Sequence, residues 1–246
     1  MSDLTPGPGP ADAPADGPGR HDDLLVVDDL MLLLLDDDGA SIQGAGTLYY
    51  TLGGAVLTEL ALLGRVETDD TGVLNGPRVT PAGSGPLPDP LLQQAYDTVA
   101  EKTQRVQPLL VALGADLWRE VIDRLARRGL VERQESRVLG LFRTTRWPAA
   151  DQEHEARLRE RIRAVLEDGE APDPRTAAVI GLLSASGALP SLRPPLPWTT
   201  RTATRAKEIE QGQWGPEAVA TAVTRTAAAI AASSAAVAVS VATSGR

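Results

Sequence analysis

The chain has 246 residues, with 24 Lys and Arg against 33 Asp and Glu, two His and no Cys. This length, with 42% hydrophobic residues, is enough to bury a sizeable core. The absence of Cys excludes a disulfide framework, a thiolate zinc site, an iron–sulfur cluster and a Cys nucleophile.

The net charge of −9 is unevenly distributed along the chain. Residues 1–40 contain ten Asp and one Arg, so residues 41–246 contain 23 charges of each sign. The acidity therefore belongs to the N-terminal stretch, and the remainder of the chain is neutral overall. The net charge does not argue against a phosphate-bearing partner.

The N-terminal 40 residues predict a tail, a helix and a turn. Residues 1–21 are rich in Pro, Gly and Asp, which predicts a disordered tail before a single domain at 22–243. The tail lacks the basic and apolar regions of a secretory signal, and together with the missing Cys this favours the cytoplasm. Leu24–Leu35 is apolar on nearly all sides and too short to span a bilayer, so we expect a buried helix. Asp36–Asp38 predicts a solvated turn.

The next elements are a second apolar helix, two strands and a third helix. Gly53–Arg65 has helical recurrence of apolar residues, and its one carboxylate, Glu59, is expected to be paired or to lie at a solvated edge. Two short apolar stretches within Val66–Thr80 predict strands. A proline-rich loop then leads to a helix over Leu91–Thr103.

The middle of the chain is basic. Leu117–Arg128 predicts an amphipathic helix with charged residues on its outer face. Leu130–Arg133 and Val138–Phe142 flank Gln134–Arg137, a pattern that predicts a β-hairpin. Residues 119–146 contain eight Arg and four acidic residues. The sequence therefore predicts a basic helix-plus-hairpin surface.

Three helices are expected in the C-terminal part. Residues 151–167 predict a long charged helix, and Arg175–Ala185 predicts a core helix. Four prolines within Pro190–Pro197 interrupt the chain. Pro216–Val241 predicts a buried last helix, because Arg225 and the Ala and Ser residues disfavour a membrane span.

No catalytic or cofactor-binding motif is present in the sequence. It has no Gly-x-Ser-x-Gly, Walker A, dinucleotide-binding or His-Glu-x-x-His pattern. His21 and His154 are far apart in sequence and are expected at the surface. We therefore expect no enzyme activity, metal or cofactor. Nucleic-acid binding is not expected either, because a net basic balance and a recognition motif are lacking.

The helix Gly53–Arg65 resembles the most distinctive stretch of the Golgi phosphoprotein 3 family, G-x-x-L-x-E-L-x-L-x-G-R. Further blocks resemble the family in the same order, so that the resemblance extends over about residues 22–240. These blocks are Leu24–Leu35 with its acidic turn, Leu87–Leu92, Leu125–Val131, Leu141–Pro148 and Asp173–Leu183.

The resemblance implies a mainly α, single globular helical domain with apolar central helices, surrounding amphipathic helices and a projecting β-hairpin. It also implies a peripheral membrane protein that binds phosphatidylinositol 4-phosphate in a basic pocket. The positions of that pocket correspond to Gly44, Gly53, Ala115 and Trp118, none of which is basic, although a shift of one residue would bring in Arg119. The bias toward Ala and Arg suggests a bacterial member, for which a Golgi role is excluded.

Two functions are compatible with these observations. The first is a lipid-binding protein whose basic surface contacts anionic phospholipid on the cytoplasmic membrane face. The residues expected at the head group are Trp118, Arg119, Arg124, Arg127, Arg128, Arg143 and Arg146. The alternative is a protein-interaction adaptor or a self-associating scaffold without phosphoinositide specificity. The hairpin residues expected to form its homo-oligomer contact are Arg137, Val138, Leu139, Leu141 and Phe142.

Overall fold

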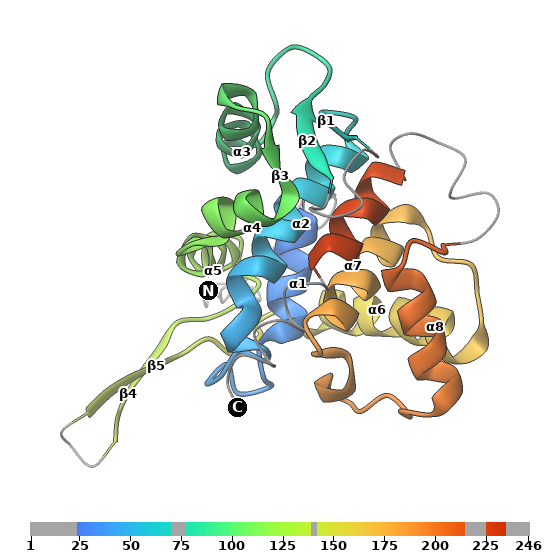
Figure 1. The fold of residues 1–246 in the computed structure, drawn as a ribbon. Coiled ribbons are helices and arrows are strands. Elements are labelled where there is room, and N and C mark those ends of the chain that lie inside the picture. Colours follow the sequence, from blue (N-terminus) through green and yellow to red (C-terminus); the bar gives the residue numbers. More distant parts are fainter. Residues whose placement is uncertain (1–23, 70–76, 139–141, 215–224, 235–246) are drawn as a thin grey trace, which may run out of the picture.

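The computed structural model describes residues 24–69, 77–138, 142–214 and 225–234, with side chains in the hairpin described up to residue 135 and again from residue 144. Helices dominate, and two small sheets lie at the periphery (Figure 1). The prediction of a mainly α, single globular domain is confirmed.

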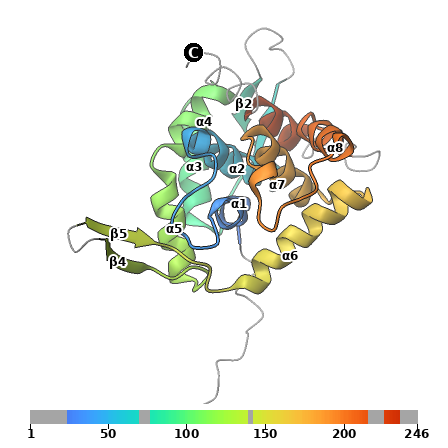
Figure 2. The same ribbon diagram turned by 90° about the horizontal axis from the view of Figure 1, so that it is seen from below.

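Three helices form the centre of the molecule. They are α1 (Val26–Leu34), α2 (Leu48–Leu62) and α7 (Pro174–Ala185), and they lie side by side in Figures 1 and 2. Every residue of α1 is buried, as the sequence predicted for a helix that is apolar on nearly all sides. The helix expected at Gly53 begins earlier, at Leu48, after a short 3-10 turn (Ala45–Thr47).

Helix α4 (Val106–Gly114) packs unusually close to α2 and was not predicted. A Cβ at Gly53 of α2 would lie 2.3 Å from the Leu110 carbonyl oxygen, and a Cβ at Gly114 would lie 1.7 Å from the Tyr49 carbonyl oxygen. Only glycine permits backbones to approach so closely. The two glycines therefore fix the position of α4 on α2.

Helix α3 and a small sheet cover one end of α2. Helix α3 (Pro90–Glu101) begins after Asp89, whose side chain accepts a hydrogen bond from the Leu91 N–H at 2.9 Å, and it matches the predicted helix. Strands β1 (Val66–Thr68) and β2 (Arg78–Pro81) pair antiparallel, which confirms the two predicted strands. A third strand, β3 (Gln104–Arg105), was not predicted.

The predicted amphipathic helix and hairpin are present, but the hairpin register differs from the prediction. Helix α5 (Leu117–Arg127) leads to strands β4 (Gln134–Val138) and β5 (Phe142–Arg146), which project away from the helices (Figures 1 and 2). The segment predicted as the turn, Gln134–Arg137, lies within β4. Leu130 and Val131, predicted as strand residues, are buried at the hairpin root.

Two peripheral helices and a final helical segment complete the fold. Helix α6 (Gln152–Arg163) continues into a π-helical turn (Ala164–Asp168), and together they match the predicted charged helix. A 3-10 turn (Leu189–Ser191) precedes α8 (Thr200–Glu210), which was not predicted. Of the predicted last helix, residues 225–234 are described, and they are helical. Within the described ranges, no helix is long and apolar enough to cross a membrane.

Candidate functional site

A buried ion-pair network surrounds the N-terminus of α1. The Asp28 carboxylate, fully buried, accepts hydrogen bonds from the Leu25 N–H at 2.9 Å and from Arg124 Nε at 3.0 Å. Arg124 Nη1 also lies 2.5 Å from the Asp89 carboxylate at the start of α3. Arg124 therefore joins α1, α3 and α5 from inside the protein.

The second half of the network lies on the other side of α1. Asp29 accepts hydrogen bonds from two guanidinium nitrogens of Arg175, at 3.0 and 2.8 Å, and lies 2.9 Å from His154 Nε2. Glu59 accepts a hydrogen bond from the Val26 N–H at 2.6 Å and from Arg175 at 3.2 Å. Glu59 is therefore paired, which was one of the two expected alternatives.

The network holds helices together and offers no room for a substrate. Burial raises the pKa of Glu59, against the opposing effects of the Arg175 charge and the Val26 N–H. The cavity beside Asp29 and Arg175 measures only about 10 Å³. No group of three or more His, Asp or Glu side chains in the described part of the chain is arranged to hold a metal ion.

Two sequence-based placements need correction. The predicted surface position of His154 is wrong, because its side chain is only 12% exposed and contacts Asp29. Arg124 was expected on the outer, lipid-binding face of its helix, but its side chain is only 11% exposed and bonds two carboxylates. We therefore exclude Arg124 from the candidate surface. Asp28 and Asp29, which contribute to the acidity of the N-terminal stretch, likewise belong to the core.

The other predicted lipid-binding residues lie on α5 and at the hairpin root, on one side of the molecule (Figures 1 and 2). Arg119, Arg127 and Arg146 are exposed, and Arg128 is partly buried. Trp118 is partly buried, with the Arg119 guanidinium 5.2 Å from its ring centroid. We call Arg119, Arg127, Arg128 and Arg146 the α5–hairpin surface. Arg143 belongs to β5, but its side chain lies outside the described set.

The hairpin root is fixed to the turn after α1. The Trp147 N–H donates to the Gly39 carbonyl at 2.8 Å, and a Cβ at Gly39 would lie 2.0 Å from the Trp147 carbonyl carbon. The predicted oligomerisation residues occupy the far end of the hairpin, where Arg137 pairs with Arg143 and Val138 with Phe142. Leu139 and Leu141 lie outside the described residues.

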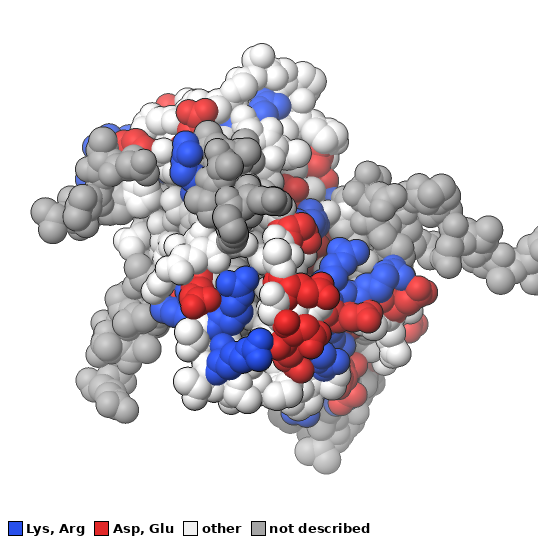
Figure 3. Space-filling view, turned by 90° about the vertical axis from the view of Figure 1, so that its right-hand side faces the viewer, with Lys and Arg blue, Asp and Glu red and all other residues white. Residues whose placement is uncertain are grey.

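The side of the molecule that carries α6 and α8 has a different charge pattern. Basic and acidic side chains are intermingled on the face shown in Figure 3. Ion pairs within these helices account for this mixture: Arg157–Glu153 at 2.6 Å and Arg163–Glu167 at 3.2 Å in and after α6, and Lys207–Glu210 at 2.5 Å in α8. By contrast, no described carboxylate forms an ion pair with Arg127 or Arg146.

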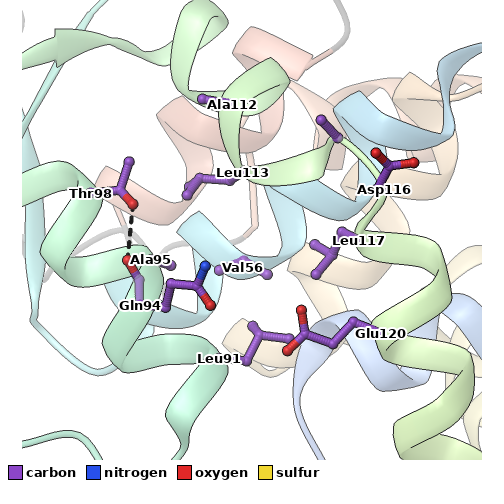
Figure 4. Close-up of a pocket in the computed structure, with 11 residues that line it drawn as sticks. Val56, Leu91, Gln94, Ala95, Thr98, Ala112, Leu113, Asp116, Leu117 and Glu120 are labelled. Carbon is purple, nitrogen blue, oxygen red and sulfur yellow. Dashed lines mark hydrogen bonds between the residues drawn. The ribbon is translucent and has the colours of Figure 1, made fainter.

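Two pockets lie on either side of the turn between α4 and α5. The first, of about 210 Å³, is bounded by α3, α4 and α5, and polar side chains such as Gln94, Thr98 and Glu120 line it together with leucines (Figure 4). The second, of about 490 Å³, lies at the start of α2. Its lining includes Ile42, Leu48, Tyr49, Leu52, Asp116 and Trp118, and we call it the apolar pocket.

The apolar pocket lies where the family resemblance implies a phosphate-binding pocket. Ala115 and Trp118 line it, but Gly53 faces the Leu110 carbonyl, where no larger side chain fits. No basic side chain is among the residues that line it. Trp118 was predicted as a head-group residue, but the pocket beside it was not predicted, although the small residues Gly114 and Ala115 before Trp118 were an available signal.

Residues 26–226 match the family model described as Golgi phosphoprotein 3 (GPP34). This match spans most of the chain and includes the central helices, α5 and the hairpin. A comparison with curated proteins finds no match.

Proposed function

The chain belongs to the Golgi phosphoprotein 3 family, and from this premise we propose that it is a peripheral membrane protein that binds anionic phospholipid. The α5–hairpin surface is the proposed contact, acting at the cytoplasmic face of a membrane. The observation that carries the proposal is the exposure of Arg127 and Arg146 without an ion pair to a described carboxylate. Guanidinium groups in this state are available to phosphate oxygens.

The proposed recognition is of negative charge rather than of one phosphoinositide. None of the positions that the family resemblance assigns to the phosphate pocket is basic, and Gly53 has no space for a basic side chain. Each Arg near an anionic membrane contributes about 1 kcal/mol to the free energy of binding, so the loss of two Arg weakens binding about 30-fold. Such binding weakens as salt screens the surface charge.

Vesicle co-sedimentation tests the proposal. We expect binding to phosphatidylcholine vesicles that contain phosphatidylglycerol, and not to phosphatidylcholine alone. The double variant Arg127→Glu/Arg146→Glu is expected to lose at least the 30-fold estimated above, of the order of 2 kcal/mol. The matched control is Arg201→Glu/Arg205→Glu, which makes the same charge change on α8, on the opposite side of the molecule (Figures 1 and 2).

Three outcomes decide the proposal. Absence of binding to anionic vesicles at low salt would refute it. An equal loss of vesicle binding in both double variants would show that the membrane contact does not lie specifically on α5 and the hairpin. Vesicles in which phosphatidylinositol 4-phosphate replaces phosphatidylglycerol at matched charge test specificity. Much tighter binding to those vesicles would refute recognition by charge alone.

A second candidate function is self-association through the hairpin. Strands β4 and β5 pair only with each other among the described strands, so both outer edges of this sheet are open to a further strand. Gln134 and Arg146 are Cα partners, so an Asn-Gly turn can replace residues 135–145 without moving the root. We expect the shortened chain to have a smaller mass by light scattering if the hairpin joins protomers. An unchanged mass would exclude this role.

A further inference from the structure

The residues that line the apolar pocket at the start of α2 include none of the four Arg of the α5–hairpin surface. Its volume of about 490 Å³ lies within the range of ordinary ligand pockets. The loop before α2, the first turns of α2 and the start of α5 form its walls. It therefore has the size and position of a separate binding site.

The walls suit an uncharged chain. Ile42, Leu48 and Leu52 supply aliphatic surface, and Tyr49 and Trp118 supply aromatic rings. A phosphate inside this pocket would lose its hydration without meeting a basic side chain, which is costly. Hydrocarbon incurs no such cost and gains from leaving water.

The mouth of the pocket carries the charged groups. Asp116 has a side chain that is 82% exposed and lies 3.7 Å from the Arg119 guanidinium, which is itself 67% exposed. The same guanidinium lies over the Trp118 ring. A ligand with a hydrocarbon chain in the pocket would place an acidic head group near Arg119, where it would compete with the exposed Asp116 carboxylate for the guanidinium.

The walls also connect the pocket with the α5–hairpin surface. Ile42 follows Gly39, the residue to which the Trp147 N–H at the hairpin root donates its hydrogen bond. Trp118 belongs to α5, the helix that also carries Arg127. Both walls are therefore part of, or bonded to, the elements proposed to meet the membrane.

We propose that the apolar pocket binds one aliphatic acyl chain, from a membrane lipid or a free fatty acid, with the acidic head group at Arg119. The inference rests on the proposed membrane role and shares Arg119 with it, but the residues that line the pocket are not part of the α5–hairpin surface. It can therefore be tested in solution without vesicles, where a failure of surface binding has no effect.

The primary experiment is a fluorescence titration of the full chain with cis-parinaric acid, a fatty acid that becomes fluorescent in apolar surroundings. We expect saturable binding of one molecule per chain, with displacement by palmitate. Ala115→Phe places a ring at the pocket wall and is expected to weaken binding at least about tenfold. Ala45→Phe fills the pocket from the opposite wall and serves as an independent second variant.

Ala112→Phe is the matched control. Ala112 is exposed on α4 near Ala115 and lines only the first pocket (Figure 4), so the same substitution there should leave probe binding unchanged. Circular dichroism confirms that each variant is folded. The membrane arm uses phosphatidylcholine and phosphatidylglycerol vesicles with spin-labelled acyl chains, which should quench Trp fluorescence in the wild type more than in Ala115→Phe. Quenching assigns the chain to membrane lipid, and probe binding without quenching assigns it to free fatty acid.

Several results would overturn the inference. These are an absence of saturable probe binding, equal binding by Ala112→Phe and the two filled variants, and displacement by phosphocholine but not by palmitate. If Arg127→Glu/Arg146→Glu loses vesicle binding but still binds cis-parinaric acid, by contrast, the result supports an acyl-chain site in the apolar pocket.

Discussion

Replacing Arg124 with Met tests whether the buried network stabilises the fold. Met fills a similar volume but removes the guanidinium that bonds Asp28 at 3.0 Å and Asp89 at 2.5 Å. Asp28 is fully buried and keeps only the Leu25 N–H as a partner. Breaking a buried ion pair from one side costs about 3–5 kcal/mol, because it leaves an uncompensated charge. We expect a loss of this size in the free energy of unfolding at neutral pH.

The loss in Arg124→Met should depend on pH in a defined direction. Burial already raises the pKa of Asp28, against the opposing effects of the Leu25 N–H and the Arg124 charge. Removing Arg124 raises this pKa further. A carboxyl group with a raised pKa in the folded state loses stability as pH rises from its ordinary pKa through the folded value. The variant should therefore lose less stability at about pH 5, where Asp28 can bind a proton, than at about pH 8.

Urea unfolding followed by circular dichroism at both pH values measures the effect. The matched control is Arg127→Met, one turn further along α5, where the side chain is exposed and a change within about 0.5 kcal/mol is expected. Adding Asp28→Leu to Arg124→Met removes both charges and should recover much of the loss. A loss below about 1 kcal/mol in Arg124→Met, or one that does not change with pH, would refute the reasoning.

Two further substitutions and a salt dependence probe the packing, one helix cap and the charge surface. Gly114→Ala places a Cβ 1.7 Å from the Tyr49 carbonyl oxygen and should cost about 3 kcal/mol or more in thermal or urea unfolding, whereas Gly46→Ala, with no atom within 4 Å, should be nearly neutral. Asp173→Ala removes the cap of α7, which accepts from the Arg175 and Thr176 N–H groups at 2.9 and 3.0 Å, and should cost about 1 kcal/mol. Burial opposes ionisation of Asp173, but these hydrogen bonds outweigh burial and lower the pKa of its carboxyl group. The stability that the cap contributes should therefore be fully present above the ordinary pKa of Asp. It should be lost as pH falls through the lowered pKa of the folded state. Vesicle binding should fall sharply between low salt and about 0.5 M salt, and a salt-independent affinity would contradict an electrostatic surface.

The central helices were predictable because their sequences are apolar in every direction. Leu24–Leu35 leaves no face for water, and α1 is indeed buried throughout. Helix α8 was missed for the opposite reason, since its buried face consists of small or weakly apolar residues such as Thr202 and Ala206 beside Ile209. Helix α4 was missed because Pro108 lies near its start and the segment is short. Tertiary packing, not local pattern, specifies these two helices.

The hairpin was predicted at the right place in the chain but with its strands shifted toward the N-terminus. Leu130 and Val131 suggested a strand, and Val131 does form an antiparallel β-bridge with Ala149. Both side chains are buried because they follow α5 into the core, where the Leu130 N–H donates to the Leu125 carbonyl. The strand that follows is polar, from Gln134 onward, and it pairs with β5 alone among the described strands. A strand with polar residues at successive positions carries no apolar alternation, so its register could not be derived from the sequence.

Arg124 shows why the candidate site was predicted only in part from the sequence. It follows Leu117 by seven positions and Val121 by three, which places it on the buried side of α5. A count of Arg residues does not distinguish Arg124 from Arg127. Arg124 is nevertheless buried, whereas Arg127, about one helical turn later, is exposed. The signal for its role was in a distant segment, since two adjacent carboxylates, Asp28 and Asp29, within an apolar helix require buried cations.

The packing of α4 on α2 connects the fold with the proposed ligand chemistry. The close approach at Gly53 and Gly114 leaves no volume for a basic side chain at position 53, and the same approach forms one end of the apolar pocket. Positive charge is instead found outside, at Arg119, Arg127 and Arg146. A lipid whose hydrocarbon chain lies in the apolar pocket and whose phosphate lies at the exposed Arg residues would bury no unpaired charge. The glycines that fix α4 would thereby also separate the two chemistries, and the proposed membrane role would then need no buried phosphate site.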